Sequence, residues 1–114
     1  MSQELDLTYL EEVTGGSEEI IKEMLELFLN DTPQQIALIK ENSKEKNWDV
    51  VRSEAHKLKP SFLYIGLLDA YKKLEELETN ARTGEGLENV SEKIDFIDNR
   101  LSEVYAKIKL MTNS

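Results

Sequence analysis

Apolar residues recur at intervals of three and four along almost the whole 114-residue chain. This spacing places them on one face of an α-helix, because the helix repeats every 3.6 residues. No segment alternates apolar and polar residues with a period of two, which is the pattern of a half-buried strand. The clearest helical run comprises Leu87, Val90, Ile94, Ile97, Leu101, Val104, Ile108 and Met111. The spacing therefore predicts an all-α protein.

Cap and turn residues delimit the first two predicted helices. Thr8 followed by Glu11 matches a capping box for a short first helix carrying Leu7, Leu10 and Val13, and Gly15-Gly16 ends it. Ser17 caps a long second helix, which we expect to kink or restart near Pro33. Its apolar positions are Ile21, Met24, Leu25, Phe28, Ile36 and Ile39.

Three more helices follow, separated by short turns. Asn47 caps the third, Gly66 precedes the fourth, and the turn at residues 83–86 precedes the last. The apolar positions of the third and fourth helices are Trp48, Val51, Ala55, Leu58, Phe62 and Ile65, and Ala70, Leu74, Leu77 and Ala81. Four substantial amphipathic helices with short connections predict an antiparallel up-and-down four-helix bundle. We expect residues 1–114 to form one domain, with the short first helix at one end.

Composition limits the classes of function. The chain carries 23 acidic and 14 basic residues, a formal net charge of −9. Affinity for nucleic acid comes mainly from basic side chains, so we expect no nucleic-acid partner. No stretch approaches the roughly 20 apolar residues that cross a bilayer, and the acidic start has no signal-peptide pattern. We expect a soluble, cytoplasmic protein without a membrane partner.

The only histidine, His56, lies in the third predicted helix, four residues before Pro60. At about 100° per residue, His56 falls roughly 130° from the centre of the apolar stripe, so its side chain should project from the outer flank. Proline has no backbone N–H, and its ring crowds the carbonyl four residues earlier. We therefore expect a local bend of the helix at His56.

The neighbours of His56 on this flank are unusual for so acidic a chain. Arg52 lies one turn before His56, and Lys59, Pro60 and then Leu63 follow within two turns. The basic residues could stabilise negative charge added to the ring, and the apolar pair could form a docking surface. The simplest alternative is an ordinary surface histidine, and scattered exposed leucines are common.

Other chemistries of a lone histidine lack the residues they need. A zinc site requires three or four ligands, and the chain has no cysteine and no second histidine. A Ser-His-Asp site requires a nucleophile turn and an oxyanion hole, which the pattern does not indicate. The glycine pairs lack the flanking strand and lysine of a phosphate-binding loop. We expect no metal and no cofactor. An exposed imidazole can still accept a phosphoryl group and pass it on.

The sequence HKLKPS at residues 56–61, followed by Gly66, resembles the signature of histidine-containing phosphotransfer (HPt) domains. Leu27-Phe28 before Thr32-Pro33 is similar to the long second helix of that family, and Asn47-Trp48 to the usual entry of the histidine helix. The resemblance covers roughly residues 5–111. Pro60 departs from it, because glycine is commonest at this position.

The resemblance implies roles for individual residues. His56 matches the phospho-acceptor, modified on Nε2, and Lys59 matches the basic residue that supports the phosphoryl group. Ser61 matches a small residue where helices pack closely, and Gly66 matches the further glycine. Arg82 corresponds to a basic residue near the site in some members. Arg52, Pro60, Leu63 and Arg82 are then expected to contact the partner.

The same resemblance implies partners. A receiver domain of a response regulator, or of a hybrid histidine kinase, would supply the aspartate and the Mg²⁺. The chain would act as a monomeric carrier in a phosphorelay, not as an enzyme. The alternative that remains open is a non-catalytic helical adaptor, which binds a partner through the face of Arg52, Pro60 and Leu63.

Overall fold

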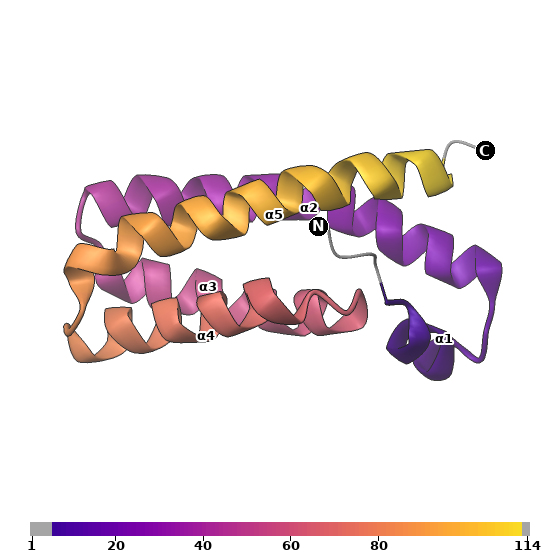
Figure 1. Ribbon diagram of the computed structural model, residues 1–114, viewed down its shortest axis with the longest axis horizontal. Coiled ribbons are helices and arrows are strands. Elements are labelled where there is room, and N and C mark those ends of the chain that lie inside the picture. The colour runs from indigo at the N-terminus through magenta and orange to yellow at the C-terminus, as the bar shows by residue number, and fades with distance from the viewer. Residues whose placement is uncertain (1–5, 113–114) are drawn as a thin grey trace.

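The computed structural model describes residues 6–112, and this part of the chain is helical almost throughout (Figure 1). The described elements are α1 (Thr8–Thr14), α2 (Glu18–Lys44), α3 (Trp48–Tyr64), α4 (Leu68–Thr83), the 3₁₀ turn η1 (Leu87–Asn89) and α5 (Val90–Thr112). The prediction of an all-α protein is confirmed. Within these residues, no helix is long and apolar enough to cross a membrane.

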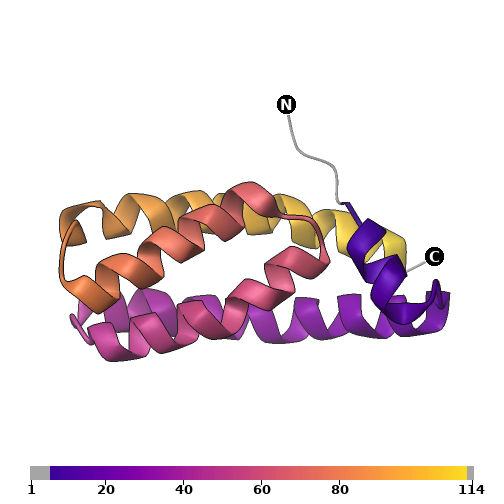
Figure 2. The ribbon, with the colours of Figure 1, turned by 90° about the horizontal axis from the view of Figure 1, so that it is seen from below.

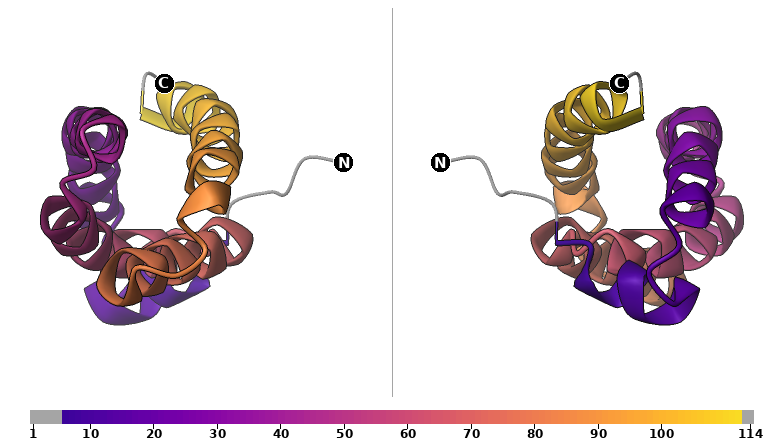
Figure 3. Two further views of the ribbon diagram at one scale, coloured as in Figure 1. Left: turned by 90° about the vertical axis from the view of Figure 1, so that its left-hand side faces the viewer. Right: turned by 90° about the vertical axis from the view of Figure 1, so that its right-hand side faces the viewer.

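The four long helices form an antiparallel bundle. α3 packs against both α2 and α4, α4 packs against α5, and α5 packs against α2. Viewed along the bundle axis, α2 and α5 stand on either side while α3 and α4 form the base (Figure 3). α1 lies at the end of the bundle where α2 begins, and it contacts α2 and α3. Stacked rings of Tyr9 and Tyr64, 5.6 Å apart, join α1 to α3. The predicted architecture is confirmed.

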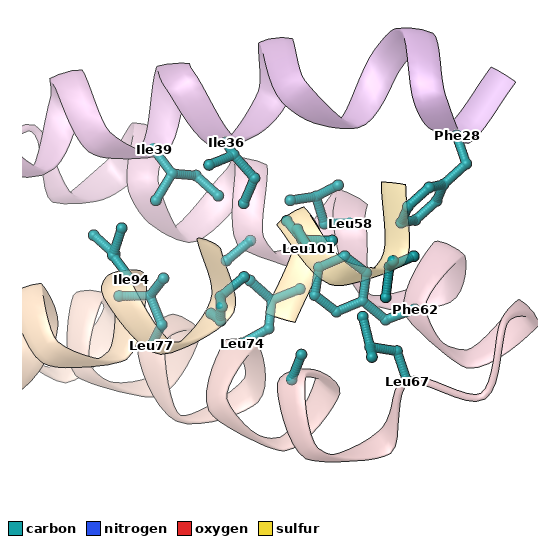
Figure 4. Packing of buried hydrophobic residues seen from close by; sticks show 14 of the residues in the cluster. Phe28, Ile36, Ile39, Leu58, Phe62, Leu67, Leu74, Leu77, Ile94 and Leu101 are labelled. Atoms are coloured by element: carbon teal, nitrogen blue, oxygen red, sulfur yellow. The ribbon is translucent and has the colours of Figure 1, made fainter. Parts of the chain in front are cut away.

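The core consists of the apolar stripes that the sequence predicts. Phe62 from α3 lies at its centre, and Phe28 from α2 contacts both Phe62 and Tyr105 of α5 through its ring. Figure 4 shows side chains from all four long helices meeting between them. Burial of each such side chain contributes about 1.5–3 kcal/mol to stability. Met111 is the exception in the last stripe, because it lies near the end of α5 and is largely exposed.

The local cap predictions have mixed outcomes. Gly15 ends α1 with a left-handed conformation, and Ser17 accepts a hydrogen bond from the Ile20 N–H, as predicted. The capping box of Thr8 and Glu11 is wrong. Thr8 is already the first residue of α1, and its N–H donates to the Asp6 carboxylate at 3.0 Å. The N-cap position is Leu7, and the carboxylate of Asp6 before it supplies the hydrogen bond.

The structure tests three further boundary predictions. α2 runs uninterrupted through Pro33, which confirms one long helix and excludes a restart there (Figure 2). Thr32 and Ile36 are both buried, so core packing on either side of the exposed proline keeps one helix in register. Asn47 occupies the N-cap position of α3, but its side chain donates to Asn42 instead of capping the helix. The last helix begins at Val90, after η1, and not at Leu87.

Gly66 makes the tight turn between α3 and α4. Its φ of 70° lies in the left-handed region, where a side chain is unfavourable. A Cβ at this position would lie 2.6 Å from both the Cβ and the carbonyl oxygen of Asp6. The N–H of Asp6 also donates to the Ile65 carbonyl at 3.3 Å. Glycine therefore allows the chain before α1 to lie directly on the α3–α4 turn.

We predict that Gly66→Ala costs about 2 kcal/mol or more in the free energy of unfolding, because it combines backbone strain with a clash. Gly84→Ala is the matched control, since Gly84 also has a left-handed φ but open space around it. That control should lose only about 1 kcal/mol. Urea unfolding followed by circular dichroism measures both. Equal losses would contradict the close packing of Asp6 on Gly66.

Candidate functional site

His56 lies on the outer flank of α3, as its angle from the apolar stripe predicts. Its side chain is 68% exposed, whereas Ala55 and Leu58 beside it are completely buried. The helix presents the imidazole to solvent because these two neighbours face the core. α3 continues through Pro60 to Tyr64, so the proline does not end the helix. The site is thus an exposed ring on a well-packed helix.

One carboxylate on α4 holds both His56 and Lys59. Oε2 of Glu78 lies 2.7 Å from Nδ1 of His56, and Oε1 lies 2.6 Å from Nζ of Lys59. The Lys59 and Glu78 side chains are mostly covered, with 19% and 16% of their surfaces exposed. The two contacts use separate oxygens, so Glu78 binds both partners at once.

The pairing of α3 with α4 brings these side chains together. The two helices run antiparallel on either side of the turn at Gly66, with His56 ten residues before it and Glu78 twelve after. Buried residues beside the site, Leu58 on α3 and Leu74 and Leu77 on α4, hold the two backbones in this register. The core therefore determines which residue of α4 faces the histidine.

The hydrogen bond of Glu78 selects one tautomer of the imidazole. An ionised carboxylate can only accept, so Nδ1 of His56 must carry the proton. A neutral ring then has its lone pair on Nε2, on the opposite side from Glu78. The arrangement can present a nucleophilic nitrogen to an incoming group while holding the other nitrogen still.

The charges of Lys59 and Glu78 support each other. Burial opposes ionisation of Glu78, but hydrogen bonds from Lys59 and His56 and the nearby positive charge hold the pKa of its carboxyl below the ordinary value. The hydrogen bond to Glu78 raises the pKa of the Lys59 ammonium, against a smaller effect of burial. Both groups are therefore charged near neutral pH, and the pair is formed before any phosphate arrives.

The other predicted site residues lie around this centre without joining it. Arg52 is exposed one turn before His56, and Arg82 is exposed one turn after Glu78. Pro60 is exposed, and Leu63 is 39% exposed. Among residues 6–112, neither arginine forms an ion pair. The structure thus joins His56 and Lys59 and leaves the remaining four residues as a surrounding surface.

Ser61 lines a groove on another face of α3. The groove has a volume of about 260 Å³ and lies between α1, α2 and the last turns of α3. Its lining includes Leu27, Phe28 and Tyr64. Ser61 thus lies at the wall of this groove, and its expected role as a small residue where helices pack closely stays a prediction.

Glu78 is the residue that the sequence analysis missed. The chain contains 23 acidic residues, and nothing in their spacing distinguishes the one that faces His56. Glu78 lies four residues before Arg82, on the same face of α4, but this spacing alone does not single it out. Among the described residues there is no group of three or more His, Cys, Asp or Glu that could hold a metal ion.

Two comparisons with known proteins found matches over most of the chain. A family model described as "Hpt domain" matches residues 23–107. A solved structure of the HPT domain from a sensor hybrid histidine kinase of Shewanella has a TM-score of 0.81 and 18% sequence identity. The alignment covers 96% of this chain and 93% of that domain. At this identity the likeness shows the fold. No curated protein matches the chain.

We predict that Lys59→Met raises the pKa of the Glu78 carboxyl, because the substitution removes a donor and a positive charge. Carbon-13 NMR titration of the side-chain carboxyl measures this pKa. The lowered pKa also means that Glu78 stabilises the fold above the ordinary glutamate pKa and loses this contribution as pH falls through the lowered value.

Lys57→Met is the matched control for this titration. Lys57 lies on the same helix but pairs with Glu54, at 3.8 Å, and not with Glu78. It should leave the Glu78 titration unchanged. A Glu78 pKa that does not respond to Lys59→Met would contradict the ion pair.

Proposed function

The chain belongs to the Hpt domain family of two-component phosphotransfer domains, and from this we propose that it accepts a phosphoryl group on Nε2 of His56 and passes it on. The observation that carries the proposal is the exposed imidazole whose Nδ1 is held by Glu78 at 2.7 Å. The donor and the acceptor would be aspartates of receiver domains. The chain is a carrier in this scheme and not an enzyme, since each cycle consumes and regenerates its histidine.

The transfer step follows from the tautomer. The Nε2 lone pair attacks phosphorus of the aspartyl phosphate, the Nε2–P bond forms, and the P–O bond to the aspartate breaks. The aspartate leaves as a carboxylate, and the ring becomes positively charged with its proton still on Nδ1. Glu78 offsets this new charge because its carboxylate accepts from Nδ1. The return step reverses each bond change.

The receiver would complete the site. Phosphoryl transfer passes through a loose transition state that is stabilised mainly by positioning, Mg²⁺ and cationic groups. The described residues of this chain supply Lys59 close to the imidazole, and the receiver would supply the aspartate and the Mg²⁺. We place this exchange in the cytoplasm, with the chain acting as a monomer.

The surface around His56 is suited to contact with a receiver. Pro60 has no long side chain, so it leaves the approach to the imidazole open. Leu63 offers an apolar contact on the same flank, and Arg52 and Arg82 offer positive charge at its edges. We propose that these four residues bind the receiver. Apolar contacts at the centre of an interface contribute most of its affinity, so Leu63 should matter more than the arginines.

We predict that His56→Gln abolishes phosphotransfer. Incubation with a phosphorylated receiver and Mg²⁺ should give acid-labile label on the unmodified chain and none on this variant. Lys57→Gln, an exposed substitution at the next residue, should retain labelling. Labelling of the His56→Gln variant would overturn the assignment. A non-catalytic adaptor would bind the receiver, but even the unmodified chain would never acquire label.

We predict that Leu63→Glu reduces the second-order rate of transfer from the receiver by roughly tenfold, because a charge replaces an apolar contact. Direct labelling of His56 by a small phosphoryl donor should be unaffected, which separates docking from reactivity. Leu110→Glu is the matched control, since Leu110 is 79% exposed on α5. Equal rates for the two variants would exclude Leu63 from the docking surface.

A further inference from the structure

Lys59 is already engaged before phosphorylation. Its ammonium lies 2.6 Å from Oε1 of Glu78, while the other oxygen of that carboxylate holds Nδ1 of His56. The proposed function asks the same ammonium to support a phosphoryl group on Nε2 of the same ring. Lys59 thus has two anionic partners. The Glu78 carboxylate is always present, whereas the phosphoryl group is present only while His56 is phosphorylated.

The charges at the site show the consequence. Before phosphorylation, the charges of Glu78 and Lys59 cancel, and the reactive form of the ring, with a free lone pair on Nε2, adds no charge. A phosphoryl group brings about two negative charges, and the ring, protonated on Nδ1, brings one positive charge. The site then carries a net charge of about −1, and without the Glu78 carboxylate it would be about neutral. The mostly covered positions of Lys59 and Glu78 strengthen this effect, because buried pairs are screened less by water and salt.

We propose that Glu78 competes with the phosphoryl group for Lys59, and that this competition shortens the lifetime of phosphohistidine at His56. The inference rests on the proposed function, since it concerns the phosphorylated form of the same site. Glu78 is a positioning residue here: it acts on the reacting group through Lys59 and through the imidazole.

Both of its contacts favour release of the phosphoryl group. When the group leaves, the Nε2–P bond breaks, its electron pair stays on Nε2, and phosphorus bonds to oxygen of water or of a receiver carboxylate. Because Glu78 keeps the proton on Nδ1, the departing ring is a neutral imidazole, which is a better leaving group than its anion.

The attraction of Lys59 to Glu78 also favours release of the phosphoryl group. In the loose transition state the phosphoryl group has moved away from Nε2 toward the acceptor, whose side supplies the Mg²⁺ and cationic groups. Lys59 stays on α3 beside the imidazole, so it stabilises the phosphoryl group of the ground state more. By drawing Lys59 back, Glu78 withdraws this stabilisation and brings the phosphorylated state closer to transfer.

A chemical phosphoryl donor tests the inference without any receiver. Each variant is loaded with phosphoramidate, and loss of phosphohistidine is followed by phosphorus-31 NMR. Glu78→Gln keeps the shape of the side chain and removes its charge, and it should lengthen the lifetime by about fivefold, as expected for one weakened charged hydrogen bond. Lys59→Ala should shorten it. Glu76→Gln also removes one acidic charge from α4, but its carboxylate faces Lys73 and Lys93, so the lifetime should not change.

The double variant separates competition from a general structural effect. If Glu78 acts largely through Lys59, the gain from Glu78→Gln should shrink markedly when Lys59 is already alanine. A gain of the same size in both backgrounds would overturn the competition, and so would an unchanged or shorter lifetime in Glu78→Gln alone. Circular dichroism of each variant confirms that the helices are intact.

Labelling by a phosphorylated receiver tests the proposed function separately from the lifetimes. Failure of a phosphorylated receiver to label the unmodified chain would refute the relay role, while the lifetimes of the phosphoramidate-loaded chain would still decide the role of Glu78. Conversely, normal labelling by the receiver together with unchanged lifetimes would retain the relay role and reject the competition.

Discussion

The packing of α3 against α4 is the constraint on which the rest of the structure depends. Leu58 and Phe62 on one helix and Leu74 and Leu77 on the other are fully buried, and they hold the two backbones in one register. That register places a carboxylate of α4 opposite an imidazole of α3. The same contacts that stabilise the bundle thus set the geometry of a polar site on its surface, and the turn at Gly66 makes the close pairing of the two helices feasible.

The site combines exposure of one atom with restraint of its neighbours. His56 is open to solvent, yet its Nδ1 is held by Glu78, which also holds Lys59. A partner domain can reach Nε2 without any movement of the helices, because the imidazole already projects from the flank. Phosphotransfer between proteins needs such access on the carrier, since the phosphoryl group must pass between two surfaces. In the proposed transfer, the bundle would supply the position, and His56, Lys59 and Glu78 would supply the chemistry.

Much of the fold could be predicted from the sequence, because helical periodicity is a local signal. The burial of Leu58 and Phe62 and the exposure of His56 all follow from position along one helix. Glu78 could not be found in this way, since its importance depends on the register between two helices. The error at Thr8 has a similar origin, because the Asp6 carboxylate lies close enough to accept from the Thr8 N–H. Buried residues on both sides of Pro33 likewise keep α2 one continuous helix, as predicted, without a restart. Local rules were insufficient wherever contacts between elements decided the outcome.

The division of α3 into a buried and an exposed face has a consequence for how such a carrier can diversify. Ala55, Leu58 and Phe62 carry the packing, whereas Arg52, Pro60 and Leu63 face outward. Substitutions on the outer face should therefore cost little in folding, and in the proposed function they would alter receiver binding while leaving His56, Lys59 and Glu78 in place. If the outer face binds the receiver as proposed, recognition and stability would depend on different residues of one helix, and each could change without the other.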